Sequence, residues 1–240
     1  MKLKKLILII LLLAILFPYN QSNAESDPPN ITAGAALLMD SKTSKILYSK
    51  NEYERMYPAS TTKIIRAILA IENCNLDDVV TVPYEAIASI PSGYSIAALQ
   101  VGEQLTVNQL LQVMMVHSAN DAANVLAYHI AGSIESFATM MNTKVSELGL
   151  ENTHFTNPSG IHDENHYTTA YDLAKMMQYC MENTTFRTFA GLKSCKIPAT
   201  NKYDERVFTS TNELLTLVDN RDVPSNYYYK YAIAGKTGYT

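Results

Sequence analysis

The sequence has a central run of helical patterns with strand patterns on either side, and this order limits the folds open to it. Apolar residues recur at helical spacing from Thr106, and the pattern breaks at His117 and Ser118. We predict helices over residues 60–71, 106–117, 120–130, 133–149 and 169–181, strands over 33–40, 45–50, 194–199, 206–209 and 229–236, a short helix near 212–218, and an irregular stretch over 76–105. Strands at both ends with helices between them are typical of a mixed α/β fold whose terminal strands share one sheet.

The first residues have the pattern of a secretory signal peptide. Three lysines precede an unbroken apolar run of twelve residues, Leu6 to Phe17, and small residues at 22–24 suit a cleavage site. A membrane-spanning helix needs about 20 apolar residues, so an uncleaved anchor is an alternative that this run fits less well. We therefore predict that residues 1–24 are a signal peptide, that the protein is exported, and that residues 25–240 form one domain.

Charge and cysteine content exclude two other classes of protein. Removing the three lysines of the predicted signal changes the net charge from −4 to −7. Nucleic-acid-binding proteins usually present a basic face, so this composition argues against a nucleic-acid partner. Cys74, Cys180 and Cys195 are odd in number and widely spaced. This pattern predicts buried free thiols rather than a disulfide scaffold, with one disulfide and a leftover thiol as the alternative.

A hydroxyl and an amine stand three residues apart in Ser60-Thr61-Thr62-Lys63, at the start of the predicted helix 60–71. Residues three apart share a helix face, so Lys63 can reach Ser60. A serine hydroxyl needs a neighbouring base to act as a nucleophile, and a lysine can be that base when burial or a second cation lowers its pKa. At a helix N-terminus, the N–H of Ser60 could also stabilise a developing oxyanion.

Two further motifs could complete such a site. Ser118 lies at the predicted break between two helices, where it could relay a proton, and Asn120 offers both a donor and an acceptor for gripping a peptide amide. In the motif Lys236-Thr237-Gly238, Lys236 is the candidate second cation, and Lys236 and Thr237 could bind a carboxylate. Gly238 would let a substrate backbone approach closely.

The N–H of Tyr239 could supply a second oxyanion donor. Each of these pieces alone has a purely structural interpretation, as a helix cap, a solvated lysine or a turn. Their combination and order point instead to one site. The predicted catalytic residues are Ser60, Lys63 and Ser118, and the predicted substrate-binding residues are Asn120, Lys236, Thr237, Gly238 and Tyr239.

Ser-x-x-Lys, Ser-x-Asn and Lys-Thr-Gly in this order are typical of penicillin-binding proteins and class A β-lactamases. The sequence resembles the low-molecular-mass penicillin-binding proteins that act as serine-type D-alanyl-D-alanine carboxypeptidases. The likeness covers nearly all of the chain after the predicted signal. It includes residues 58–63 (PASTTK), 117–123 (HSANDAA), 155–158 (FTNP), 166–172 (HYTTAYD) and 235–240 (GKTGYT).

The resemblance implies a β-lactamase/transpeptidase-like α/β fold, in which a helical subdomain is inserted into an antiparallel sheet built from N- and C-terminal strands. It implies removal of the terminal D-alanine from peptidoglycan stem pentapeptides through an acyl-enzyme on Ser60, with Lys63 as base. The implied partners are a stem peptide ending in D-Ala-D-Ala and β-lactams that would acylate Ser60. The resemblance implies no metal or organic cofactor. The implied location is extracytoplasmic, at the cell wall or the outer face of the cytoplasmic membrane.

The chain departs from the family where it stops, two residues after Gly238. Family members continue with further strands of the same sheet and a terminal helix, and many add a small β-rich domain and an amphipathic membrane anchor. We therefore expect these 240 residues to be a fragment whose catalytic domain is incomplete at its C-terminus. Membrane association could come from the missing segment.

Three other interpretations fit parts of the sequence less well. A class A-like β-lactamase would carry Glu-x-x-x-Asn between the second and third motifs, and no glutamate from Glu135 to Glu213 has asparagine four residues later. A non-catalytic peptidoglycan-binding relative has no reason to keep the serine and both lysines intact. The two histidines in residues 162–166 could bind zinc on a helix face, but this segment reads as a loop and lacks the Glu that follows the first His in the metalloprotease motif.

Overall fold

The structure is a computed structural model that describes residues 29–218, 223–224 and 226–239. Residues 1–33 and 34–240 are two separate units. The predicted signal peptide lies outside the described residues, and every helix and strand given below belongs to the second unit. Within the described part of the chain, no helix combines the length and the hydropathy that crossing a membrane requires.

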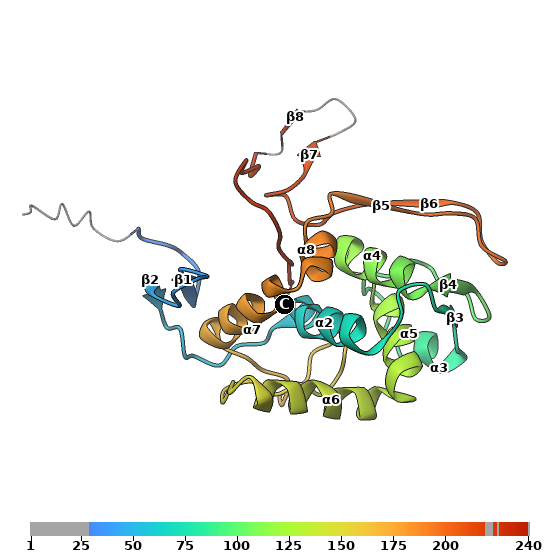
Figure 1. The fold of residues 1–240 in the computed structure, drawn as a ribbon, viewed down its shortest axis with the longest axis horizontal. Coiled ribbons are helices and arrows are strands. Elements are labelled where there is room, and N and C mark those ends of the chain that lie inside the picture. The colour runs from blue at the N-terminus through green and yellow to red at the C-terminus, as the bar shows by residue number, and fades with distance from the viewer. Residues whose placement is uncertain (1–28, 219–222, 225, 240) are drawn as a thin grey trace, which may run out of the picture. The chain divides into compact units, whose positions relative to one another are not determined.

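Strands stand at both ends of the second unit, with helices between them (Figure 1). The strands are β1 (Ala36–Met39), β2 (Ile46–Lys50), β3 (Val79–Thr81), β4 (Gln104–Thr106), β5 (Ser194–Ile197), β6 (Arg206–Thr209), β7 (Leu217–Val218) and β8 (Val223–Pro224). The helices are the 3₁₀ turn η1 (Ala59–Thr62), α2 (Lys63–Asn73), α3 (Tyr84–Ala88), α4 (Val107–His117), α5 (Asn120–Ala131), α6 (Ile134–Glu147), α7 (Ala170–Glu182) and α8 (Thr184–Ala190). This mixed content confirms the predicted α/β class.

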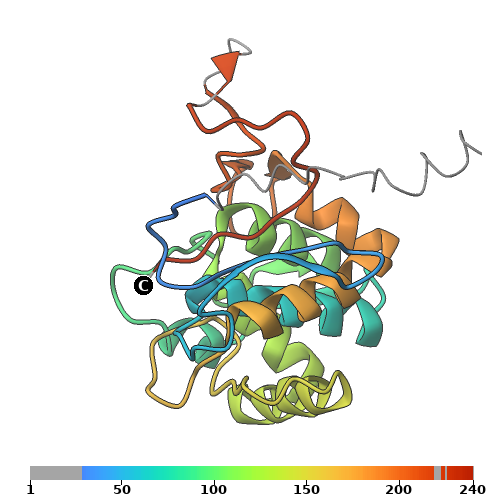
Figure 2. The ribbon, with the colours of Figure 1, turned by 90° about the vertical axis from the view of Figure 1, so that its left-hand side faces the viewer.

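Helix α2 forms the centre of the hydrophobic core. It packs against α4, α5, α6, α7 and α8, and Figures 1 and 2 show α6 on one side of this helical cluster and β7 and β8 projecting from the other. All residues of α2 from Lys63 to Ala70 are buried, as expected for a helix enclosed on every side. Two of them, Lys63 and Arg66, nevertheless have basic side chains. A buried charge is costly unless it is paired or hydrogen-bonded, so the surroundings of both side chains bear on function.

Local signals place the central helices where the sequence predicts them. Thr106 caps α4 in a reciprocal capping box with Gln109, and Gly132 ends α5 in the left-handed conformation with φ +77°. Ser133 caps α6, and Thr169 accepts from the N–H of the third helical residue of α7. The hairpin β1–β2 is also confirmed, with antiparallel pairing.

Several predicted elements are wrong in detail. The predicted helix 60–71 begins as the 3₁₀ turn η1, and its α-helical part runs from Lys63 to Asn73. The stretch 76–105, predicted to be irregular, contains β3, α3 and the start of β4, and the sequence analysis missed α8. The predicted helix at 212–218 is instead a turn followed by β7, and residues 229–236 form no strand. A strand needs a partner ladder, which a local apolar pattern cannot guarantee.

The strands form four separate two-stranded antiparallel sheets among the described residues, so the predicted shared sheet of terminal strands is not seen there. The segment 229–236 makes isolated backbone bonds instead of a ladder. Gly235 N donates to Ala190 O at the end of α8, and a Cβ on Gly191 would stand 2.7 Å from Ile233 O. This segment is therefore held by the end of α8 rather than by a neighbouring strand.

The three cysteines are free, as predicted, and two of them, Cys180 and Cys195, are buried. Cys74 is half-buried.

Candidate active site

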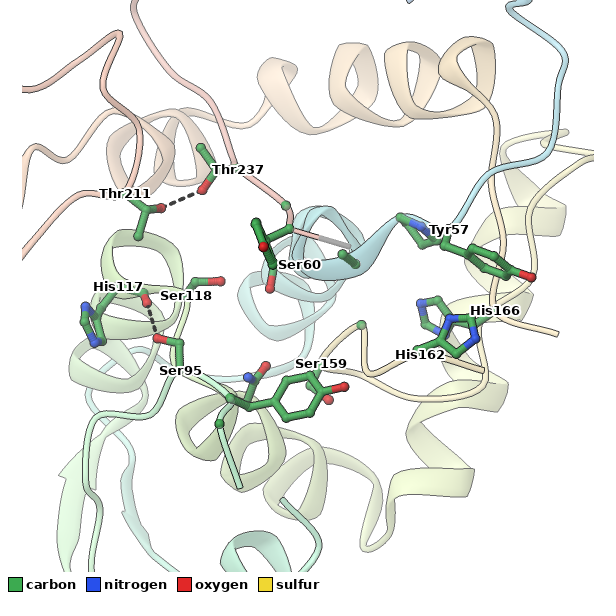
Figure 3. Close-up of a pocket in the computed structure, with 18 of the residues that line it drawn as sticks. Tyr57, Ser60, Ser95, His117, Ser118, Ser159, His162, His166, Thr211 and Thr237 are labelled. Carbon is green, nitrogen blue, oxygen red and sulfur yellow. Dashed lines mark hydrogen bonds between the residues drawn. The ribbon is translucent and has the colours of Figure 1, made fainter. Parts of the chain in front are cut away.

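The three motifs meet at one cavity of about 890 Å³ (Figure 3). Ser60 from η1, Ser118 from the end of α4 and Thr237 from the C-terminal segment all line it. Asn120, Gly238 and Tyr239 complete the set of predicted site residues in the lining. Figure 3 shows Ser60 and Ser118 on the same side of the cavity, with Tyr57, His162 and His166 on the other. Residues far apart in the chain thus converge on one concave surface.

The turn that carries Ser60 has an unusual backbone. Ala59 has φ +46°, a value that costs energy for any residue with a Cβ and persists only where the surroundings enforce it. Gly160 supplies that support, because a Cβ at Gly160 would stand 1.9 Å from Ala59 O and 3.0 Å from Ser60 N. Gly160 itself has φ +83°. The loop around Gly160 and the turn around Ser60 are therefore in direct backbone contact, and only glycine fits there.

Lys63 is within hydrogen-bond distance of Ser60, the candidate nucleophile. Its Nζ is 3.0 Å from Ser60 Oγ, 2.7 Å from Asn120 Oδ1 and 2.7 Å from Ser159 O. The last two oxygens can only accept, whereas a hydroxyl can also donate. A neutral amine has two N–H groups and one lone pair. Giving the two N–H groups to Asn120 and Ser159 leaves the lone pair for the hydroxyl proton of Ser60, which is the geometry that a general base requires.

The electrostatic environment favours the neutral form of Lys63. Burial first, and then the positive charges of Lys236 and Arg66, hold the pKa of Lys63 well below its ordinary value, while Asp121 acts in the opposite direction. Lys236 thus has the effect on the pKa of Lys63 that is expected of the predicted second cation. A lysine that titrates low can serve as a base at neutral pH.

Ser118 forms a second lysine–serine pair, with Lys236. It ends α4 in the left-handed conformation with φ +62°, which turns its hydroxyl away from the helix. Lys236 Nζ donates to Ser118 Oγ at 3.0 Å and to Thr237 O at 2.7 Å. Burial lowers the pKa of Lys236 to about 8. Lys236 is thus mostly charged at neutral pH and close to losing that charge.

The wall beside Ser118 is held by a buried carboxylate. Asp121 accepts hydrogen bonds from the N–H groups of Ala97 and Leu99 at 2.9–3.0 Å. The N–H of Asn120 donates to Ser95 O at 2.9 Å, and Ser95 Oγ donates to the carbonyl of the last α4 residue. The segment 92–95, which lines the cavity, is therefore fixed to the start of α5.

The C-terminal motif contacts two parts of the cavity lining, the segment at Thr211 and the turn around Ser60. Thr237 Oγ1 is 2.6 Å from Thr211 Oγ1, and Thr211 N donates to Val116 O of α4. A Cβ on Gly238 would stand 3.0 Å from Pro58 O, so this glycine passes close to the nucleophile turn. Tyr239 lines the rim with its side chain 96% exposed.

Comparison with known proteins bears on what this arrangement represents. A model of the D-alanyl-D-alanine carboxypeptidase family matches residues 21–240. The chain belongs to this family. It is 35% identical over 213 residues to the D-alanyl-D-alanine carboxypeptidase DacF of Bacillus subtilis, covering 87% of this chain and 51% of that relative. The chain spans about half the length of the curated relatives it matches.

Solved structures agree on the fold. A Streptomyces DD-transpeptidase superposes with a TM-score of 0.78 at 35% identity, over 88% of this chain and 82% of that one. A D-alanyl-D-alanine carboxypeptidase from Mycobacterium tuberculosis superposes with a TM-score of 0.77 at 30% identity, over 90% and 77%. The predicted β-lactamase/transpeptidase-like fold and the predicted family are therefore confirmed.

Sequence reasoning missed several residues of the cavity. Thr211 and Tyr57 line it, and Ser159 contributes only a backbone oxygen to Lys63. The ring of Tyr57 packs edge-on against His162 at 4.5 Å. The family-like stretch before Ser159 could have pointed to this loop. No residue type in a sequence, however, marks a backbone carbonyl that will bind a distant lysine. Thr211 had no signal, because its position depends on a distant contact.

His166 has a structural role beside the cavity, because both of its ring nitrogens are hydrogen-bonded. Thr156 N donates to Nδ1 at 3.1 Å, so the proton sits on Nε2, which donates to Thr62 Oγ1 at 2.8 Å. Burial lowers the pKa of His166 to about 4. The segment 161–166 contains no helix, as the sequence predicted. His166 thus links the turn beside Lys63 to the loop 156–160.

Proposed function

We propose that this protein is a serine-type D-alanyl-D-alanine carboxypeptidase that removes the terminal D-alanine from peptidoglycan stem pentapeptides. The observation that carries the proposal is the hydrogen bonding of Lys63. Two acceptor-only oxygens, from Asn120 and Ser159, occupy its N–H groups, and the hydroxyl of Ser60 occupies the third position. A buried amine in this arrangement is suited to take the serine proton.

In the proposed acylation step, Ser60 Oγ attacks the carbonyl carbon of the penultimate D-alanine while Lys63 accepts the hydroxyl proton. A C–O bond forms, and the developing oxyanion is stabilised by the N–H groups of Ser60 and Tyr239. The C–N bond to the terminal D-alanine then breaks. The leaving amine receives a proton from Lys63 through Ser118, whose hydroxyl accepts a hydrogen bond from Lys236.

Hydrolysis of the acyl-enzyme completes the reaction. A water molecule attacks the ester carbon, Lys63 accepts its proton, and Ser60 regains a proton as the C–O bond breaks. Substrate binding is assigned to the C-terminal motif. Lys236 and Thr237 would bind the terminal carboxylate, and Gly238 leaves room for the substrate backbone. β-Lactams would acylate Ser60 in the same way.

We further propose that residues 1–24 are a signal peptide and that residues 25–240 belong to a catalytic domain acting outside the cytoplasm. The family membership supports this, because peptidoglycan lies beyond the cytoplasmic membrane.

Release of D-alanine from a diacyl-D-Ala-D-Ala peptide by the full-length protein tests the proposal. We expect stoichiometric release of one D-alanine per peptide and none from a Ser60→Ala variant of equal thermal stability. A folded protein that releases no D-alanine and is not labelled by a fluorescent penicillin would refute the assignment and support a non-catalytic peptidoglycan-binding protein.

A further inference from the structure

Arg66 is a buried cation that the proposed mechanism does not use. Its side chain is fully buried in α2, and Nη1 donates to Pro158 O at 3.0 Å. Nε and Nη2 have no hydrogen-bond partner, and no ion pair of Arg66 occurs among the described residues. The guanidinium otherwise lies 5.1 Å from the ring of Phe137. Replacing a buried ion by an apolar side chain is often neutral or stabilising, so packing alone does not account for an arginine here.

The position of Arg66 relates it directly to Lys63. The two residues are three apart on α2 and therefore lie on the same face of the helix. They bind the carbonyl oxygens of consecutive residues: Lys63 that of Ser159, and Arg66 that of Pro158. The loop is stiffened from its other side, because Asn157 Oδ1 accepts from the N–H groups of residues 159–161. One rigid carbonyl pair thus connects both basic side chains.

The charges that face Lys63 come from several elements. Arg66 on α2 and Lys236 on the C-terminal segment are positive, and Asp121 on α5 is negative but bound to backbone N–H groups. His166 is neutral at physiological pH. At the far end of α2 the charge of Glu72 is paired with that of Lys144 of α6. Burial lowers the pKa of Arg66, but a guanidinium starts from such a high value that it keeps its proton.

We propose that Arg66 is a positioning residue for the acylation of Ser60. It holds the Pro158–Ser159 carbonyls against α2, so that Ser159 O fixes one N–H of Lys63. Its charge, which no carboxylate of the described residues neutralises, favours the amine form of Lys63 over the ammonium form. This inference rests on the proposed function, because it takes Lys63 to be the base.

The pH dependence of acylation distinguishes a positioning role of Arg66 from a role in packing alone. The second-order rate of labelling by a fluorescent penicillin would be measured against pH for the full-length wild type and for Arg66→Met, Arg66→Gln and Arg66→Lys. The acidic limb reports the protonation of Lys63 in the free enzyme. Loss of the nearby charge should raise its midpoint by about one pH unit in the Met and Gln variants, so that labelling on that limb slows about tenfold. The Lys variant, which keeps the charge, should stay near the wild type.

Arg187→Met is the matched control, because Arg187 is on α8 and donates to Met181 O, away from the cavity. Its profile should match the wild type. Thermal unfolding of Arg66→Met should occur at or above the wild-type temperature. Arg66→Gln, which can still donate to Pro158 O, carries the test if the Met variant is unfolded. If the midpoint of the acidic limb does not move in a folded Met or Gln variant, the inference is overturned and the proposed function stays intact. Loss of the fold in both variants has the same consequence. A wild type that is never labelled overturns both.

Discussion

Lys236 donates a hydrogen bond to Ser118 across 3.0 Å, although 118 residues separate them in the chain. A second lysine–serine pair, Lys63 and Ser60, lies at the same distance and is formed within one helical turn. The two lysines differ in their surroundings. Lys63 is fully buried, and burial with nearby positive charges holds its pKa well below the ordinary value, whereas Lys236 is half-buried and has a pKa of about 8. One lysine is thus suited to accept a proton and the other to bind an anion.

The pH profile should therefore show an alkaline limb set by Lys236. Its charge is lost as pH rises through about 8. The proposed anchor for a substrate carboxylate is lost with that charge. We expect kcat/KM for a diacyl-D-Ala-D-Ala peptide to fall above about pH 8, measured as D-alanine release. The methyl ester of the same peptide has no terminal carboxylate and should lack this limb. Equal losses for acid and ester would show that Lys236 does not bind the carboxylate.

Replacing Ser60 and replacing Ser118 by alanine should have different effects on the formation of a penicillin adduct. Ser60→Ala removes the atom that we propose forms the ester, so intact mass spectrometry should detect no penicillin adduct. Ser118→Ala removes only the proposed proton relay, so the adduct should form about 100-fold more slowly. Adduct formation at the wild-type rate in Ser118→Ala would eliminate the relay, and an adduct on Ser60→Ala would identify a different nucleophile.

The acyl-enzyme formed with a β-lactam should be long-lived. The chain has no Glu-x-x-x-Asn between its second and third motifs, and so lacks the glutamate that drives deacylation in class A β-lactamases. We expect a burst of about one equivalent of chromogenic cephalosporin followed by slow turnover. Rapid continuous hydrolysis would contradict the carboxypeptidase assignment.

Gly160 should be indispensable for the geometry of the nucleophile turn. A Cβ there would stand 1.9 Å from Ala59 O, and φ is +83°. Gly160→Ala should therefore displace the turn and slow penicillin labelling about 100-fold. Gly132→Ala is the matched control, because Gly132 also has positive φ, +77°, but nothing lies within 4 Å of an added Cβ. It should cost only about 1–2 kcal/mol of stability. Equal effects of the two substitutions on labelling would mean that the contact with Ala59 is unimportant.

His166 should make the fold sensitive to acid. Its folded-state pKa of about 4 lies below the ordinary 6.5, so the unfolded chain binds more protons between these values. Its contribution is fully present above pH 6.5 and is lost as pH falls toward 4, by about 3 kcal/mol. Unfolding temperatures measured across this range should fall for the wild type. They should fall less for His166→Gln, whose amide can replace both hydrogen bonds without titrating. Parallel pH dependence in both proteins would assign the acid sensitivity to other groups.

Local signals explain why the central helices were predictable. The capping box of Thr106 and the caps at Ser133 and Thr169 act within one turn, so their sequence patterns determine their geometry. The predicted strand at 229–236 was wrong for the opposite reason. Its β-prone residues need a partner strand, and the described residues near it offer the end of α8 instead.

The pairing of Ser60 with Lys63 follows from their order in the chain, because residues three apart in a helical turn must face the same side. The sequence also named the other two motifs, since their residue types carry the chemistry. Tertiary contacts alone bring Ser159 O to the amine of Lys63, set Gly160 against the Ser60 turn, and bury Arg66 with no carboxylate partner among the described residues. These contacts depend on backbone atoms and on burial by segments distant in the chain. Neither can be recognised from the order of residue types in the sequence.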